Sequence, residues 1–147
     1  MNILIAGASG FVGSHLSRAL LEKHHTVTGL GTSHDHALVQ SSRFTWLQAD
    51  TTRPGPWQDR VSRADVIVNL AGRTIFKRWS RSYKKELYDS RILTTRNLVA
   101  ALPPDSRAVF LSTSAAGYYG HCRDEVLNEE TAAGADFLAT TSVDWEH

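Results

Sequence analysis

The sequence predicts an α/β protein built on a doubly wound parallel sheet. Short apolar runs alternate with longer helix-like stretches along the chain, which is typical of parallel strands joined by helices on both faces. The first apolar run leads directly into a glycine-rich turn, Gly7–Gly13, and an amphipathic stretch follows. With 147 residues, 41% hydrophobic and 21% charged, the chain has the size and composition of one domain, residues 1–147. These observations predict a fold of the Rossmann type.

The first half of the chain is expected to contain three strands and two helices. The strands are Ile3–Ala6, Val27–Leu30 and Phe44–Gln48, and the helices are Phe11–Lys23 and Trp57–Arg63. In the first helix, apolar side chains at helical spacing predict the buried face: Val12, Leu16, Ala19 and Leu20.

The second half is expected to add two strands and two helices. Strands are predicted at Asp65–Leu70 and Ala108–Leu111, and helices at Ser82–Leu102 and Phe137–His147. Two prolines directly after Leu102 end the longer helix. Its predicted buried stripe is Tyr88, Ile92, Thr95, Val99 and Leu102.

The glycine turn predicts a binding site for a dinucleotide pyrophosphate. Gly7 lets the chain turn off the strand, Gly10 lets phosphates approach the backbone, and Gly13 lets the helix pack on the strand. The helix N-terminus supplies N–H groups and partial positive charge to the anion. The alternative is a tight turn in an unrelated α/β domain. The predicted cofactor-binding residues of this turn are Gly7, Ala8, Ser9, Gly10, Phe11, Val12 and Gly13.

The end of the second strand favours NADP over NAD. NAD-binding domains usually end this strand in an acid that hydrogen-bonds the ribose 2′-OH. Here Gly31 occupies that position, and Thr32, Ser33 and His34 follow it. Two hydroxyls and an imidazole can bind a 2′-phosphate, and no carboxylate repels it. NAD remains the alternative, because Asp35 comes soon afterwards.

The G-x-x-G-x-x-G spacing of Gly7–Gly13 resembles the extended branch of the short-chain dehydrogenase/reductase superfamily. Residues 69–102 and 111–120, with Ser90-Arg91 and Gly117–Gly120, are similar to its nucleoside-diphosphate-sugar epimerase-like proteins, also described as epimerase family proteins. The resemblance implies an NADP(H)-binding domain of an NAD-dependent epimerase/dehydratase family oxidoreductase, with a nucleotide-sugar-like or small carbonyl substrate. Such proteins are about twice as long, so the chain is expected to stop before the C-terminal substrate-binding part. Uncovered apolar surface then predicts either self-association, as a homo-oligomer, or weak stability.

The same resemblance implies further cofactor contacts. It places Asp50 and Thr51 at the adenine, although a helix cap or turn would explain these two residues equally well. It also places Leu70, Ala71 and Gly72 along the ribose and phosphates, and Ser112, at the end of the fifth strand, is assigned to the cofactor-binding set. Arg91 joins the cofactor-binding set, because a guanidinium can hold a phosphate in a bidentate manner. The alternative for Arg91 is an ion pair with Glu86 or Asp89.

The resemblance leaves catalysis open. Most superfamily members use a tyrosine as acid/base, with a lysine four residues later that lowers its pKa. Residues 124–147, where this pair belongs, contain neither tyrosine nor lysine. Ser114 and Tyr119 are the predicted catalytic residues. Alternatively, Tyr119 only packs over the nicotinamide, or the protein is a non-catalytic dinucleotide sensor or scaffold.

Charge and cysteine content limit the remaining function classes. The segment Arg73–Arg96 holds eight of the sixteen basic residues. A solvated surface is the favoured explanation, and attraction of a nucleotide sugar or, as a rival, of nucleic acid is the functional alternative. The histidines lack matched partners, so no metal site is assigned. The single Cys122 excludes an internal disulfide and fits a cytoplasmic protein. No apolar run is long enough to span a membrane.

Overall fold

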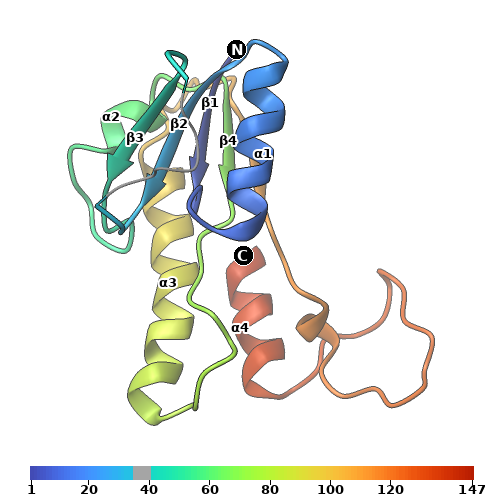
Figure 1. Ribbon diagram of the computed structural model, residues 1–147. Coiled ribbons are helices and arrows are strands. Elements are labelled where there is room, and N and C mark those ends of the chain that lie inside the picture. The colour runs from blue at the N-terminus through green and yellow to red at the C-terminus, as the bar shows by residue number, and fades with distance from the viewer. Residues whose placement is uncertain (35–40) are drawn as a thin grey trace. The chain divides into compact units, whose positions relative to one another are not determined.

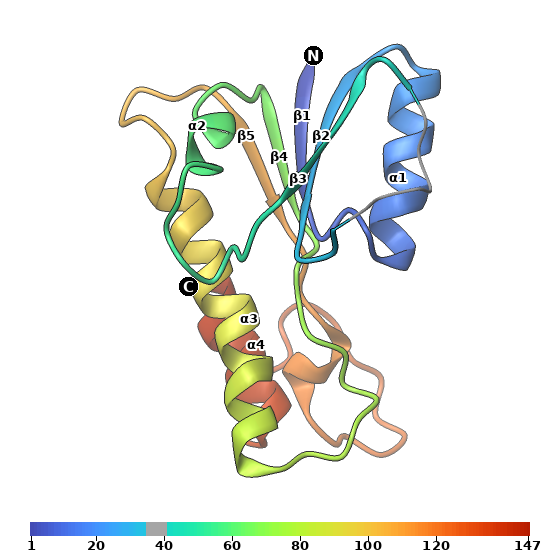
Figure 2. The ribbon, with the colours of Figure 1, turned by 60° about the vertical axis from the view of Figure 1, so that its left-hand side comes forward.

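A parallel sheet of five strands forms the centre of the first of two compact units. The computed structural model describes residues 1–34 and 41–147, and the units are Met1–Ser112 and Thr113–His147. The strand order is β3-β2-β1-β4-β5; the first four strands are labelled in Figure 1 and β5 in Figure 2. The strands are β1 (Asn2–Ala6), β2 (Thr26–Gly31), β3 (Phe44–Gln48), β4 (Val66–Asn69) and β5 (Val109–Ser112). This arrangement confirms the predicted fold class.

The strand order reverses at β1. The chain moves outward from β1 through β2 to β3, then returns to pair β4 with the other side of β1. Leu4 of β1 is in register with Thr28 of β2 and Ile67 of β4. Ligands of open α/β sheets bind at such a switch point, outside the carboxyl ends of the strands.

Alternating side chains of β1 supply both hydrophobic cores of this unit. Ile3 and Ile5 point to the face covered by α1 (Phe11–Glu22). Leu4 and Ala6 point to the opposite face, where α2 (Gln58–Val61) and α3 (Arg81–Ala100) lie. Figure 2 shows the sheet between α1 on one side and α2 and α3 on the other. Burial on both faces explains why β1 is almost continuously apolar.

Helix α1 meets the sheet through small residues at its N-terminal end and through Leu16, Leu20 and Leu21 farther along. Gly13, Ser14 and Ser17 are buried, and the Ser17 hydroxyl donates to the Gly13 carbonyl over 2.7 Å. Val12, which was predicted to be buried, is 59% exposed, so that part of the prediction is wrong. The helix approaches the strands so closely at its N-terminus that small side chains occupy the contact in place of branched ones.

Helix α3 begins after Ser80, whose side chain accepts a hydrogen bond from the Tyr83 N–H. Its buried residues are Leu87, Ile92, Thr94 and Leu98. Ile92 was predicted correctly, but Val99 is 50% exposed. The inward face is centred about one residue before the predicted stripe, because Thr94 is buried through a hydrogen bond that hydrophobic periodicity does not detect.

The second unit contains a 3₁₀ helix, η1 (Ala116–Tyr119), and the helix α4 (Phe137–Glu146). Asp136 caps α4 by accepting hydrogen bonds from the Leu138 and Ala139 N–H groups, both at 2.9 Å. The Gly134 N–H donates to the Tyr118 carbonyl over 2.9 Å, which ties the segment before α4 to η1. Sequence periodicity predicted α4 but not η1.

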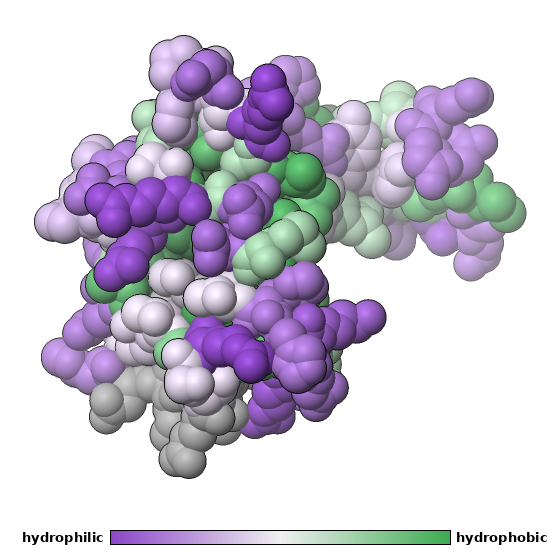
Figure 3. Space-filling model, turned by 90° about the horizontal axis from the view of Figure 1, so that it is seen from above, coloured by the Kyte–Doolittle hydropathy of each residue, from purple (hydrophilic) through white to green (hydrophobic). Residues whose placement is uncertain are grey.

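Among the described residues, no helix is both long and apolar enough to cross a membrane. The view from above in Figure 3 shows hydrophilic side chains interspersed with hydrophobic ones.

Candidate functional site

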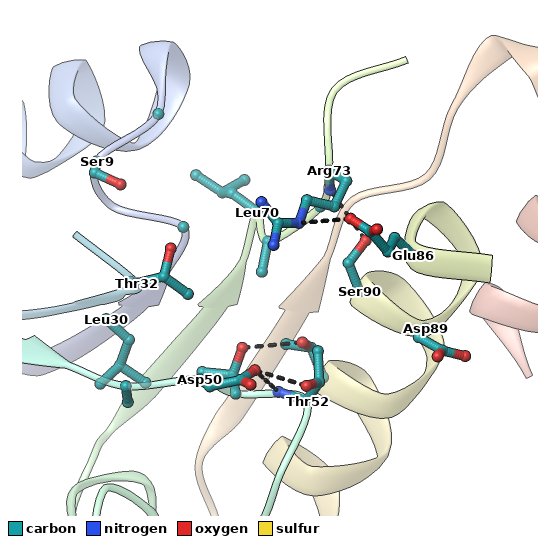
Figure 4. Close-up of a pocket in the computed structure, with 18 residues that line it drawn as sticks. Ser9, Leu30, Thr32, Asp50, Thr52, Leu70, Arg73, Glu86, Asp89 and Ser90 are labelled. Atoms are coloured by element: carbon teal, nitrogen blue, oxygen red, sulfur yellow. Dashed lines mark hydrogen bonds and ion pairs between the residues drawn. The ribbon is translucent and has the colours of Figure 1, made fainter. Parts of the chain in front are cut away.

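A cavity of about 440 Å³ lies at the carboxyl ends of β1, β2, β3 and β4. The glycine turn after β1 lines one side, and the loop after β4 lines another, together with one face of α3. In Figure 4, Ser9 and Thr32 stand opposite Arg73 and Glu86, with Asp50 below them. The volume lies within the usual range of small-molecule sites, and the position is the switch point of the sheet.

Two glycines in the turn are required by backbone geometry. Gly7 has a φ of +82°, and a Cβ there would lie 2.7 Å from the Leu70 carbonyl oxygen. A Cβ on Gly13 would lie 2.4 Å from the Gly7 carbonyl oxygen. The backbones of β1, the loop after β4 and α1 therefore pack against one another here, and any side chain would separate them.

The N-terminus of α1 opens beside this turn. Gly10 is its N-cap residue and contributes no side-chain hydrogen bond, while the first N–H groups of a helix have no acceptor within it. A Cβ on Gly10 would meet only the Gly7 oxygen, at 3.3 Å. Phe11 and Val12 are 81% and 59% exposed. These properties suit a phosphate or another anion.

The segment after β2 is held by side chains of β3. The Trp46 indole N–H donates to the Ser33 carbonyl over 3.1 Å, and the Gln48 amide donates to the Thr32 carbonyl over 3.2 Å. Thr32 and Ser33 are exposed, and Thr32 lines the cavity. Asp35, which could favour NAD, lies outside the described residues.

Asp50 lines the cavity and also organises a turn. Its carboxylate accepts hydrogen bonds from the Thr52 N–H (3.1 Å) and the Thr52 hydroxyl (2.6 Å), and it lies 3.8 Å from Arg53 Nε. Asp50 therefore stabilises a turn, as the alternative explanation expects, and it also lines the cavity.

A chain of hydrogen bonds links this turn to α3. The hydroxyls of Thr51 and Thr94 lie 2.9 Å apart and are buried. The Asn97 side chain donates to the Thr51 carbonyl, and the Gln58 side chain donates to the Asn97 carbonyl, both over 3.0 Å. We refer to Thr51, Thr94, Asn97 and Gln58 as the loop–helix network.

Asn69 connects the ends of β4 and β5. Its buried side chain donates to the Thr95 hydroxyl over 2.8 Å and to the Ser112 hydroxyl over 3.3 Å. It also accepts from the Ala71 N–H over 3.2 Å. Leu70, Ala71 and Gly72 line the cavity, whereas Ser112 does not.

Arg91 holds the backbone of the loop after β4. Its guanidinium donates to the Leu87 carbonyl over 3.0 Å and twice to the Arg73 carbonyl over 3.3 Å. Burial lowers the pKa of Arg91, partly opposed by the charge interaction with Tyr83. The two acids proposed as its ion-pair partners contact other bases: Glu86 lies 3.9 Å from Arg73, and Asp89 contacts Lys85.

The predicted catalytic residues lie in the second unit. The Ser114 hydroxyl donates to the Glu146 carboxylate at the end of α4. The Tyr119 ring packs edge-on against Tyr118, with centroids 5.2 Å apart. Sequence analysis missed the partnership of Ser114 with Glu146, since a separation of 32 residues leaves no local signal.

Several cavity residues on α3 were also missed. Glu86, Ser90 and Thr94 line the cavity, and their spacing of four residues places them on one face of the helix. This polar spacing is the signal that the sequence offers for them, and apolar periodicity does not contain it.

Cations of the basic segment contact aromatic rings. Lys77 Nζ lies 5.8 Å from the Tyr83 ring centroid, and Lys84 Nζ lies 5.9 Å from that of Trp79. Within residues 1–34 and 41–147, no three histidine, cysteine or acidic side chains are grouped so that they could hold a metal ion.

The sheet order, the glycine turn and the cavity at the switch point define a Rossmann-type α/β protein. The model of the NAD dependent epimerase/dehydratase family matches residues 3–143. The chain therefore belongs to that family.

Individual relatives agree with this assignment. An epimerase family protein of Mycobacterium leprae is 37% identical, over 98% of this chain and 45% of its own length. A nucleoside-diphosphate sugar epimerase from Corynebacterium glutamicum has a TM-score of 0.72 and 34% identity, over 100% of this chain and 30% of its own. The human epimerase family protein solved with NADPH has a TM-score of 0.74 and 23% identity, over 99% and 48%. The chain spans about half the length of the curated relatives it matches.

Proposed function

We propose that this chain binds NADP(H) and forms the cofactor-binding part of an epimerase/dehydratase-type oxidoreductase. The observation that carries the proposal is the cavity bounded by Gly7–Gly10, Thr32, Asp50 and Leu70–Gly72 at the switch point of the sheet. Binding of NADPH by the human relative supports the choice of cofactor.

Each part of the site has a task in this proposal. The pyrophosphate lies against the N–H groups at the start of α1, where Gly10 leaves room for it. The adenosine enters the cavity between the Asp50 turn and the Leu70–Gly72 backbone. Thr32 and Ser33 offer hydroxyls to a 2′-phosphate, and residues 31–34 carry no carboxylate that would repel it.

The chemistry proposed for the whole protein is hydride transfer. A bound nicotinamide cofactor would supply hydride transfer to or from a carbon that carries an alcohol or carbonyl group. In this proposal Ser114 orients the oxygen of a nucleotide-sugar-like or small carbonyl substrate, and Tyr119 exchanges its proton. Because its proton is donated to Glu146, Ser114 accepts a hydrogen bond from a substrate alcohol in this arrangement, and it must release Glu146 to donate to a carbonyl oxygen.

Calorimetric titration tests the cofactor proposal. NADPH is expected to bind the wild-type chain more tightly than NADH. The Gly10→Ala variant is expected to lose NADPH affinity at least about tenfold, because its methyl group occupies the phosphate position. Gly55→Ala is the matched control, since its Cβ would meet only the Trp57 ring, at 3.3 Å. Absence of binding by NADPH, NADP⁺, NADH and NAD⁺ would reject the proposal.

Catalysis is tested by NADPH oxidation with a panel of carbonyl compounds. Tyr119→Phe is expected to abolish turnover and leave NADPH affinity unchanged, whereas an unchanged rate would remove Tyr119 as the acid/base. NADPH binding without turnover of any substrate would favour the sensor or scaffold hypothesis instead. Duplex binding that weakens steeply with salt would favour nucleic-acid recognition by Arg73–Arg96.

A further inference from the structure

Two glycines on one face of β2 lie beneath the Trp46 ring of β3. Gly29 and Gly31 are two residues apart, so they face the same side of the strand, and Gly29 is in register with Trp46. A Cβ on Gly29 would lie 3.1 Å from Trp46 Cε3. A Cβ on Gly31 would lie 2.6 Å from Trp46 Cη2 and 3.2 Å from Trp46 Cζ2. The ring therefore spans the space that both side chains would occupy.

The Trp46 ring is held from more than one direction. Its N–H donates to the Ser33 carbonyl over 3.1 Å, and the residue packs against the cluster formed by Ile3, Ile5, Ala8 and Val27. A side chain on Gly31 would have to displace the ring from this packing and break the hydrogen bond. The obstruction is therefore costly to relieve.

Gly31 is the last residue of β2, which is where NAD-binding Rossmann domains place the acid that contacts the ribose 2′-OH. A Cβ on Gly31 would also lie 3.2 Å from Ser9 Oγ, so a side chain there would extend toward the glycine turn. An NAD-selecting carboxylate at position 31 would therefore need the space next to Gly31 that the Trp46 ring and the Ser9 hydroxyl limit.

We propose that Trp46 is a specificity-determining residue for the cofactor. Its ring excludes any side chain, and therefore any carboxylate, from position 31. Its indole N–H fixes the Ser33 backbone, which keeps the neutral Thr32–Ser33 segment beside the 2′ position. NADP(H) is selected because the acid that would repel the 2′-phosphate has no room. This inference rests on the proposed NADP(H) function.

A double-mutant cycle of Gly31 and Trp46, measured by thermal unfolding, tests without any cofactor whether the Trp46 ring excludes a side chain at position 31. Gly31→Ala is expected to lower the Tm of the wild-type chain, and Trp46→Ala is expected to relieve that loss, so that adding Gly31→Ala to Trp46→Ala lowers the Tm little or not at all. Phe44→Ala is the matched control. Phe44 faces Gly29, with Cζ 3.0 Å from its added Cβ, but is not among the nearest atoms at Gly31. Equal losses in all three backgrounds would overturn the proposal.

Cofactor affinities test the specificity half. Trp46→Ala alone is expected to weaken NADPH binding without inverting the preference, because it introduces no charge. The double variant Gly31→Asp, Trp46→Ala is expected to shift the NADPH-to-NADH affinity ratio toward NADH by at least about tenfold, through repulsion of the 2′-phosphate. Trp46→Leu with Gly31→Asp serves as a second version if the alanine variant does not fold.

The outcomes separate the two proposals. A double variant that folds and keeps the wild-type preference for NADPH would overturn the role of Trp46 alone. A Gly31→Asp single variant with wild-type Tm would overturn it as well. A wild-type chain that binds neither dinucleotide would reject the proposed function and, with it, the specificity role, whatever the stability cycle gives.

Discussion

Gly13 and Gly10 occupy the same turn but meet different constraints. A Cβ on Gly13 would clash with the Gly7 carbonyl oxygen at 2.4 Å, whereas a Cβ on Gly10 would lie 3.3 Å from the same oxygen. Gly13→Ala is expected to destabilise the fold by about 1–3 kcal/mol, because α1 must move away from β1. Gly10→Ala should change the free energy of unfolding less and affect NADPH affinity more. Denaturant unfolding and calorimetry on both variants check this division, and equal destabilisation by both would contradict it.

Arg91 offers a second comparison at the scale of single residues. Its guanidinium donates to carbonyls of Arg73 and Leu87, so Arg91→Lys is expected to lower stability by about 1 kcal/mol or more through loss of the planar fork. If Arg91 only positions the loop, the salt dependence of NADPH affinity should stay as in the wild type. A weaker salt dependence in Arg91→Gln, which removes the charge that Arg91→Lys keeps, would instead indicate a direct contact with phosphate. Arg96→Lys, at an exposed position of the same helix, is the control.

Single residues were predictable from sequence where backbone geometry dictates the residue type. Gly7 and Gly13 are examples, because their requirement follows from a strand that turns directly into a helix. Residues whose place depends on distant partners were not predictable. The Trp46 ring lies next to Gly31 of the neighbouring strand. Glu146 accepts a hydrogen bond from Ser114, which is 32 positions away. Neither contact leaves a periodic pattern in the sequence.

At the scale of elements, α3 shows what periodicity detects and what it misses. Its limits were predicted within two residues, because Ser80 caps the start and Pro103 follows the end. Its buried face was displaced, since polar Thr94 is inside and apolar Val99 is half-exposed. The hydrophobic pattern therefore defines a helix better than it defines which side of that helix faces the sheet.

Leu98 and Val99 test the corrected face of α3. Leu98 is fully buried in the core with Leu4, Leu30 and Ile67, so Leu98→Ala is expected to cost about 2–5 kcal/mol of stability. Val99→Ala should change stability by less than about 0.5 kcal/mol. Chemical denaturation of the two variants provides the measurement. A larger loss for Val99→Ala would restore the face predicted from sequence.

At the scale of the whole molecule, β5 is the last strand of the described sheet. Val109 and Leu111 are two residues apart and therefore lie on the same face of β5. They are 52% and 53% exposed. Such an edge favours pairing with another chain, in line with the predicted self-association. Sedimentation velocity should show concentration-dependent association of the wild-type chain, and Leu111→Lys should weaken it. A wild-type chain that stays monomeric at high concentration would contradict this expectation.

The loop–helix network connects the proposed adenosine site to the C-terminal half of α3. Thr51 borders the cavity, and its hydroxyl and carbonyl are held by Thr94 and Asn97 of that helix. Local opening of this turn therefore requires bonds to the helix to break, and a ligand that keeps the turn closed suppresses such opening. Occupancy of the cavity would then slow amide hydrogen exchange in the C-terminal half of α3, around Thr94 and Asn97.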